Sequence, residues 1–142
     1  MPEEFLKVVM DSNVFLRTLI SGGDILKLVF DQRLKLLAPK KLIAEFEKHK
    51  EEILSKSKLP KRKFDLLLSL VLKRIIFVPE ESYKSSIPQA EKLLEGHKKD
   101  REFLALCLSE NVKFWTYEKK FFRLEIAIST REISRELFKI SG

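Results

Sequence analysis

The chain contains few of the residues that interrupt or cross-link a fold. Its 142 residues include four glycines, five prolines and one cysteine. The single cysteine, Cys107, excludes an internal disulfide, and its leucine-rich surroundings indicate a buried hydrophobe rather than a reactive thiol. No apolar run approaches the roughly 20 residues of a membrane-spanning helix, so we expect no membrane partner. The opening MPEEFLKVVM lacks the basic-then-apolar layout of a secretory signal, and we expect a cytoplasmic protein.

Acidic residues are in deficit. There are 21 Asp and Glu against 28 Lys and Arg, which gives a formal net charge of +7. This balance favours anionic partners, nucleic acid first, although heat-adapted proteins carry similar surfaces without binding anything. Apolar residues make up 44% and charged residues 35%, which excludes a disordered chain, and the length predicts a single domain over residues 1–142.

Hydrophobic periodicity predicts strands and helices in alternation. Strands are predicted at 5–10, 35–39, 75–79, 112–116 and 124–129, and helices at 13–20, 24–34, 40–57, 60–74, 81–96, 98–111 and 130–140. Such alternation implies an α/β fold with three layers, in which helices cover both faces of a central parallel sheet of four to five strands. Ligands bind such sheets beyond the carboxyl ends of the strands, where the strand order reverses.

Four acids fall at the predicted rim of this sheet. Asp11 ends the first strand, Glu45 lies early in helix 40–57, Asp100 begins helix 98–111, and Glu118 follows the fourth strand. Crowded carboxylates repel one another unless a cation compensates, and oxygen ligands favour Mg²⁺ or Mn²⁺. Such a site suits phosphodiester cleavage, because the metal activates water and neutralises charge on the phosphate.

Each acid also has an ordinary explanation. Asp11 is a favoured helix cap, and Glu45 resembles any exposed helix glutamate. Asp100 complements a helix dipole, and Glu118 can pair with a neighbouring lysine at the surface. The joint pattern, rather than any one of the four, therefore indicates a site.

Several segments carry a resemblance to a known family. The stretches VVMDSNVFL, APKKLIAEFEKHKEEI, DREFLALCLSENVKFWTYEKKF and IAISTRE together resemble the PIN-domain ribonucleases, which include the VapC-like toxins of toxin–antitoxin pairs. Residues 56–97 match in layout only. The resemblance implies a PIN-like three-layer fold and a Mg²⁺- or Mn²⁺-dependent endoribonuclease that cleaves RNA and leaves a 5′-phosphate.

The resemblance also assigns roles to residues of the predicted site. It implies that Asp11, Glu45 and Asp100 are catalytic metal ligands, and that Asn13 and Thr116 hold the acids or the metal-bound water.

The fourth acid departs from the family pattern. The family commonly has T-x-D before a lysine, whereas TYEKKF provides Glu118 as the fourth catalytic and metal-binding acid. Lys120 stands where another acid is frequent. This difference bears on the affinity for metal and on whether a second metal binds.

Basic residues cluster in two places. We expect them to bind the RNA backbone without sequence choice, although a solvated loop without a partner is the alternative for the first cluster. They are Lys56, Lys58, Lys61, Arg62 and Lys63 around a proline turn, and Lys98, Lys99 and Arg101 beside Asp100.

The favoured function is a metal-dependent endoribonuclease, with a toxin role that would imply an antitoxin partner. Homodimers are common in the family, and the apolar stripe FDLLLSLVL on helix 60–74 offers a surface for one. The alternative is a catalytically weakened RNA-binding or scaffold module, motivated by Glu118 and Lys120. A phosphohydrolase that forms an aspartyl-phosphate is disfavoured, because it needs an acid two positions after Asp11, where the chain has Asn13.

Overall fold

A five-stranded sheet forms the centre of the molecule. The computed structural model describes residues 4–96 and 98–141. All strand pairs are parallel, and the strand order is β3-β2-β1-β4-β5. The strands are β1 (Leu6–Met10), β2 (Leu34–Pro39), β3 (Ile75–Val78), β4 (Lys113–Trp115) and β5 (Ala127–Ile128).

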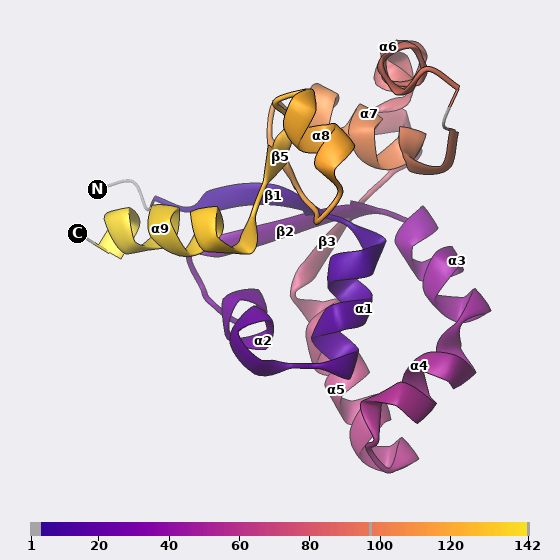
Figure 1. Cartoon of the computed structure of the whole chain (residues 1–142), viewed down its shortest axis with the longest axis vertical. Coiled ribbons are helices and arrows are strands. Elements are labelled where there is room, and N and C mark those ends of the chain that lie inside the picture. Colours follow the sequence, from indigo (N-terminus) through magenta and orange to yellow (C-terminus); the bar gives the residue numbers. More distant parts are fainter. Residues whose placement is uncertain (1–3, 97, 142) are drawn as a thin grey trace.

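Helices cover both faces of the sheet, so the predicted α/β three-layer class is confirmed. In Figure 1, α1, α2, α4 and α5 lie on one side of the strands, and α6, α7 and α8 lie on the other. The helices are α1 (Ser12–Ile20), α2 (Gly23–Val29), α3 (Lys41–Lys48), α4 (Lys50–Ser57), α5 (Lys61–Lys73), α6 (Ile87–Leu94), α7 (Arg101–Glu110), α8 (Lys119–Arg123) and α9 (Thr130–Ser141). None of the described helices has the length and apolar character needed to cross a membrane.

The central strands are apolar along their length because both of their faces are covered. Val8, Val9 and Met10 of β1 are fully buried, as are Phe114 and Trp115 of β4. Continuous rather than alternating hydrophobicity is typical of strands in parallel sheets. Cys107 of α7 is also buried in this core, as predicted, and burial raises the pKa of its thiol.

The predicted helix 40–57 is divided in the structure. His49, with φ −120° and ψ 13°, ends α3 and precedes α4. Both segments pack against α1, and Phe46 meets Phe15 edge-to-face at 5.7 Å between ring centroids. The bend at His49 lets both α3 and α4 stay in contact with α1. Residues 40–57 contain neither glycine nor proline, so no residue type in the sequence signals this bend.

Several other elements differ from the prediction: the helix predicted at 24–34 ends at Val29, and the strand predicted at 124–129 covers only Ala127–Ile128. Residues 80–86 form two 3₁₀ turns, η1 (Glu80–Ser82) and η2 (Lys84–Ser86), before α6 begins. The five-residue helix α8 was not predicted, because its periodic pattern is too short to recognise. It places Phe121 edge-to-face on Phe114, with ring centroids 4.9 Å apart. This contact fixes the segment that follows β4.

The strand order reverses at β1. This strand pairs with β2 on one side and with β4 on the other, and the Asp11 N–H continues the second pairing by donating to the Trp115 carbonyl at 3.0 Å. Asp11 and Thr116 therefore leave adjacent strands at the same edge. This is the position where ligands bind sheets of this type.

Candidate functional site

Asp11 is a buried carboxylate at the start of a helix. Its backbone is extended, with φ −70° and ψ 148°, and it caps α1 by accepting the Asn13 N–H on Oδ1 at 3.4 Å. Its Oδ2 accepts a hydrogen bond from the Thr116 hydroxyl at 2.6 Å. The residue is 3% exposed, and it forms no ion pair with any residue in 4–96 or 98–141.

The charge on Asp11 is incompletely compensated. Burial raises the pKa of this carboxyl most strongly, and the nearby carboxylates of Asp100 and Glu118 raise it further. The hydrogen bonds from Thr116 and Asn13 lower the pKa only in part, so it reaches about 6. Because like charges and burial both disfavour ionisation, a cation bound here would relieve a cost that is already present.

Asp100 and Glu118 reach this edge from different elements. Asp100 ends η3 (Lys98–Asp100) and is 5% exposed, while Glu118 caps α8. The Glu118 N–H donates to the Thr116 hydroxyl oxygen at 3.1 Å. Thr116 therefore donates to Asp11 and accepts from Glu118, which holds the two acid-bearing segments together.

Lys120 lies between two of the acids. Its Nζ is 3.2 Å from Asp100 Oδ2 and 3.4 Å from Glu118 Oε2. Burial opposes the lysine charge, but hydrogen bonding and attraction to the two carboxylates raise the pKa of Lys120 above its ordinary value. The ammonium therefore remains charged at neutral pH and neutralises this side of the cluster.

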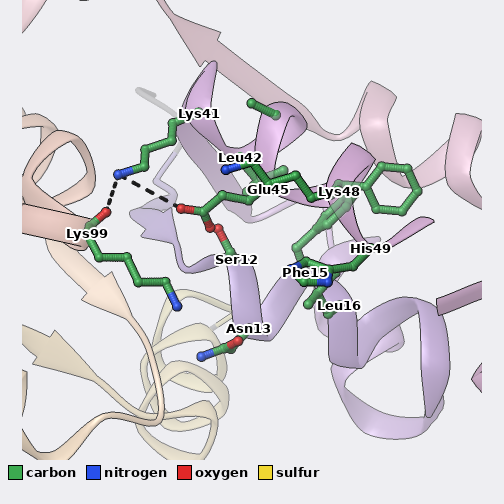
Figure 2. A pocket seen from close by; sticks show the side chains of 12 residues that line it. Ser12, Asn13, Phe15, Leu16, Lys41, Leu42, Glu45, Lys48, His49 and Lys99 are labelled. Carbon is green, nitrogen blue, oxygen red and sulfur yellow. Dashed lines mark hydrogen bonds and ion pairs between the residues drawn. The ribbon is translucent and has the colours of Figure 1, made fainter. Parts of the chain in front are cut away.

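A pocket of about 410 Å³ opens beside the acids (Figure 2). Ser12 and Asn13, which follow Asp11, line it together with Lys99, which precedes Asp100. The opposite wall comes from α3, including Glu45. The acid cluster and the pocket therefore share one edge of the sheet.

Glu45 lies in this pocket, separate from the other three acids. Its Oε1 is 4.0 Å from Nζ of Lys41, which also donates to the Lys99 carbonyl (Figure 2). Lys41 pairs with Glu102 as well, at 3.1 Å. Glu45 is not among the charges that raise the pKa of Asp11. The structure therefore brings Asp11, Asp100 and Glu118 into one electrostatic cluster and places Glu45 on an adjoining wall.

The two polar residues after Asp11 differ in their surroundings. The Ser12 hydroxyl oxygen is buried and has no hydrogen-bond partner among the described residues, whereas Asn13 is exposed. Buried hydroxyl groups are normally paired, with protein or with water. The Ser12 hydroxyl group, which lines the pocket, is therefore available to hydrogen-bond a solvent molecule or a ligand.

The donor types in this region fit a divalent cation. Carboxylate and hydroxyl oxygens are the ligands that Mg²⁺ and Mn²⁺ favour, and the raised pKa of Asp11 marks a deficit of positive charge. As the side chains lie, however, the described residues include no group of three or more His, Cys, Asp or Glu placed to hold a metal ion. The acids thus supply suitable charge without forming a preassembled ligand shell.

The predicted basic residues lie in two separate regions. Lys98 and Lys99 are exposed beside the pocket, and Arg101 pairs with Glu102 at 3.3 Å and Glu91 at 3.9 Å. The other cluster surrounds the turn between α4 and α5, which Figure 1 shows at the far end of the molecule from α8. It comprises Lys56, Lys58, Lys61, Arg62 and Lys63, of which Lys56 pairs with Glu52 and Lys61 with Asp65, each at 2.8 Å.

The sequence did not predict the ion pairs that two lysines form near the site. Lys120 was recognised as a departure from the family pattern, but its position between two acids depends on the short helix α8. Lys41 had only the signal of an i,i+4 spacing to Glu45, which is common on helix surfaces. Their interactions arise from tertiary packing rather than from local sequence.

Comparisons with known proteins identify the family. A family model described as PIN domain matches residues 9–138, which is most of the chain. A search of curated proteins finds no match. The chain belongs to the PIN domain family, whose members are typically nucleases that use divalent metals.

Proposed function

We propose that the protein is an endoribonuclease that uses Mg²⁺ or Mn²⁺ to cleave RNA phosphodiester bonds. The observation that carries the proposal is the buried Asp11 carboxylate, whose pKa rises to about 6 through burial and the neighbouring Asp100 and Glu118 charges. Asp100 and Glu118, from distant parts of the chain, lie close enough to Asp11 at the strand-order reversal to raise its pKa. A structural role would not require this unfavourable concentration of charge.

In this proposal the acids divide the work of holding the cation. Asp11 and Asp100 bind it, and Glu118 contributes charge from the opposite side. Thr116 positions Asp11 through the 2.6 Å hydrogen bond and anchors the Glu118 backbone. A bound divalent ion would supply a Lewis acid for the phosphate and would lower the pKa of water.

The adjoining pocket places other polar groups near the substrate. Glu45 and Asn13 line it, and we assign them to orienting the attacking water or the ribose beside the scissile bond. The buried Ser12 hydroxyl lacks a partner among the described residues and can hold solvent at the same wall. The pocket therefore offers hydrogen-bond acceptors and donors beside the acid cluster.

We assign the RNA path to the basic residues around η3. Lys98 and Lys99 are exposed there, and neither side chain forms an ion pair with another described residue. Arg101 lies on the next turn. The cluster from Lys56 to Lys63 would contact RNA only if the strand extends along α4 and α5. Phosphate contacts of this kind supply affinity without sequence choice.

A toxin role, with an antitoxin that covers the pocket, is the finer form of this proposal, and we place it in the cytoplasm. A homodimer through α5 is supported by the exposure of Leu66 and Leu70, at 62% and 42%. Exposed leucines on one helix face are a surface that association would bury.

The test is cleavage of a fluorescent RNA by the full chain with Mn²⁺ and with EDTA. We expect cutting only with Mn²⁺, and a loss of at least about 100-fold in Asp11→Asn and Asp100→Asn, because each removes a charge at the reacting centre. Asp24→Asn, an exposed acid of α2, is the matched control and should cut normally. Cutting that survives in Asp11→Asn would refute the proposal.

A second candidate function follows from one observation. Lys120 already contacts Asp100 and Glu118, as expected of a PIN-fold module that binds RNA and has lost cleavage. Such a module would bind the same RNA equally with Mn²⁺ or EDTA and would leave it intact. The cleavage assay therefore separates the two functions directly.

A further inference from the structure

Lys120 is held inside the acid cluster from several directions. Its Nζ lies 3.2 Å from Asp100 and 3.4 Å from Glu118, and it also sits 5.1 Å from the centre of the Phe121 ring. Contacts to two carboxylates and an aromatic face restrict the side chain far more than a single surface ion pair does. The ammonium therefore belongs to the charge balance of the site.

The Lys120 ammonium lies between two carboxylates, in the way that a metal ion shared by two acidic side chains does. In sites with two metals, the ions lie about 3.5–4 Å apart and share the surrounding carboxylates. Here two acids share the Lys120 ammonium, while Asp11 has hydrogen-bond donors and no cationic partner among the described residues. The negative charge of the cluster is thus balanced by a cation near Glu118 and is not balanced by one near Asp11.

We propose that the Lys120 ammonium takes the place of a second metal ion, so that this protein binds one divalent cation, on the Asp11 side of the cluster. The inference rests on the proposed function, because it assumes that the acids hold a catalytic metal. Mg²⁺ needs oxygen ligands at about 2.0–2.1 Å, so a second ion near Glu118 would have to displace the lysine. Lys120 supplies one positive charge there without metal.

Lys119 provides a matched comparison. It precedes Lys120 in α8, carries the same charge and is exposed, and no ion pair joins it to another described residue. Any effect of Lys120 that depends only on the overall charge of the protein should appear equally at Lys119. An effect that depends on the position of the ammonium should not.

The experiment counts bound Mn²⁺ on the full chain by the electron paramagnetic resonance signal of the free ion. We expect one ion on the wild type, two on Lys120→Asp, and one on Lys119→Asp, which has the same change in charge. Two ions on the wild type, or equal numbers on both variants, would overturn the inference while leaving a metal nuclease intact. No bound ion on the wild type would instead contradict the proposed function.

A second variant covers the case in which Lys120→Asp does not fold. Lys120→Met keeps the aliphatic length and removes the charge, so the remaining acids should bind Mn²⁺ about tenfold more tightly or better. Lys119→Met should bind Mn²⁺ like the wild type. An unchanged affinity in Lys120→Met would overturn the inference.

Discussion

Thr116 donates its hydroxyl hydrogen to the Asp11 carboxylate over 2.6 Å, although 105 positions separate the two residues in sequence. The same oxygen accepts the Glu118 N–H at 3.1 Å. One fully buried hydroxyl therefore links the end of β1 to the segment that carries the fourth acid. This link connects the carboxyl ends of β1 and β4.

Replacing Thr116 with valine tests that link. Valine keeps the shape but leaves a buried carboxylate oxygen without its donor, so we expect the free energy of unfolding to fall by about 2 kcal/mol. Loss of a group that orients a metal-binding acid typically costs about 10-fold to 100-fold in activity. Urea unfolding and RNA cleavage measure the two effects. Thr116→Ser, which retains the hydroxyl, should restore both, and failure to do so would contradict the role of the hydrogen bond.

Asp11→Asn should stabilise the protein at neutral pH in the absence of metal. Because the pKa of Asp11 is about 6 in the folded state against an ordinary 3.8, folding binds its proton more tightly. The stability from this group is therefore fully present below about pH 4 and is lost as the pH rises through about 6. Asparagine is also a favoured cap and keeps one acceptor oxygen in place of the two that Asp11 uses, so the gain at pH 7.5 should be about 1–3 kcal/mol.

Urea unfolding of Asp11→Asn with EDTA at pH 4 and pH 7.5 measures this gain. Asp31→Asn is a control of opposite sign, because the hydrogen bond from Arg33 lowers the pKa of Asp31. It should lose stability at neutral pH. If Asp11→Asn is less stable than the wild type at pH 7.5, the claim that the buried Asp11 charge destabilises the metal-free protein is wrong.

Arg74 ties the connection between α2 and β2 to the rest of the fold. Its guanidinium donates to the carbonyls of Val29 and Asp31 at 2.9 Å and of Leu34 at 3.2 Å. Arg74→Met should lower the free energy of unfolding by about 3 kcal/mol, and Arg74→Lys should recover only part, because an ammonium lacks the planar fork. Lys73→Met, at the exposed neighbouring position, should change it by less than about 0.5 kcal/mol.

Lys99 should contact the RNA backbone. In EDTA, Lys99→Gln should weaken binding of a single-stranded RNA and reduce the slope of log affinity against log salt by about 0.7. Lys63→Gln, at an exposed position in the first turn of α5, should change the slope less. Fluorescence anisotropy over a salt series measures both slopes. A larger effect at Lys63 would place the RNA along the other basic cluster.

The sequence predicted the fold class because strong, regular patterns encode it. The apolar run that ends at Asp11 identified a buried parallel strand, and the acid at its end marked the edge where polar side chains gather. Asp100, which was predicted to begin a helix at that edge, directly precedes α7 in the structure. These features depend on local pattern and on the general geometry of parallel sheets.

The remaining features depend on tertiary contacts. No residue type marks the bend at His49, which follows the packing of α3 and α4 on α1. The helix α8 is five residues long, too short for a periodic signal, yet it places Lys120 between Asp100 and Glu118. The separation of Glu45 from the three clustered acids likewise follows from where α3 meets the sheet.

Anomalous diffraction from crystals soaked in Mn²⁺ would locate the cation relative to the acids. We expect one strong peak at coordination distance from Asp11 and Asp100, with Lys120 still beside Glu118. The absence of a peak at Asp11, with Mn²⁺ bound elsewhere on the molecule, would contradict this expectation.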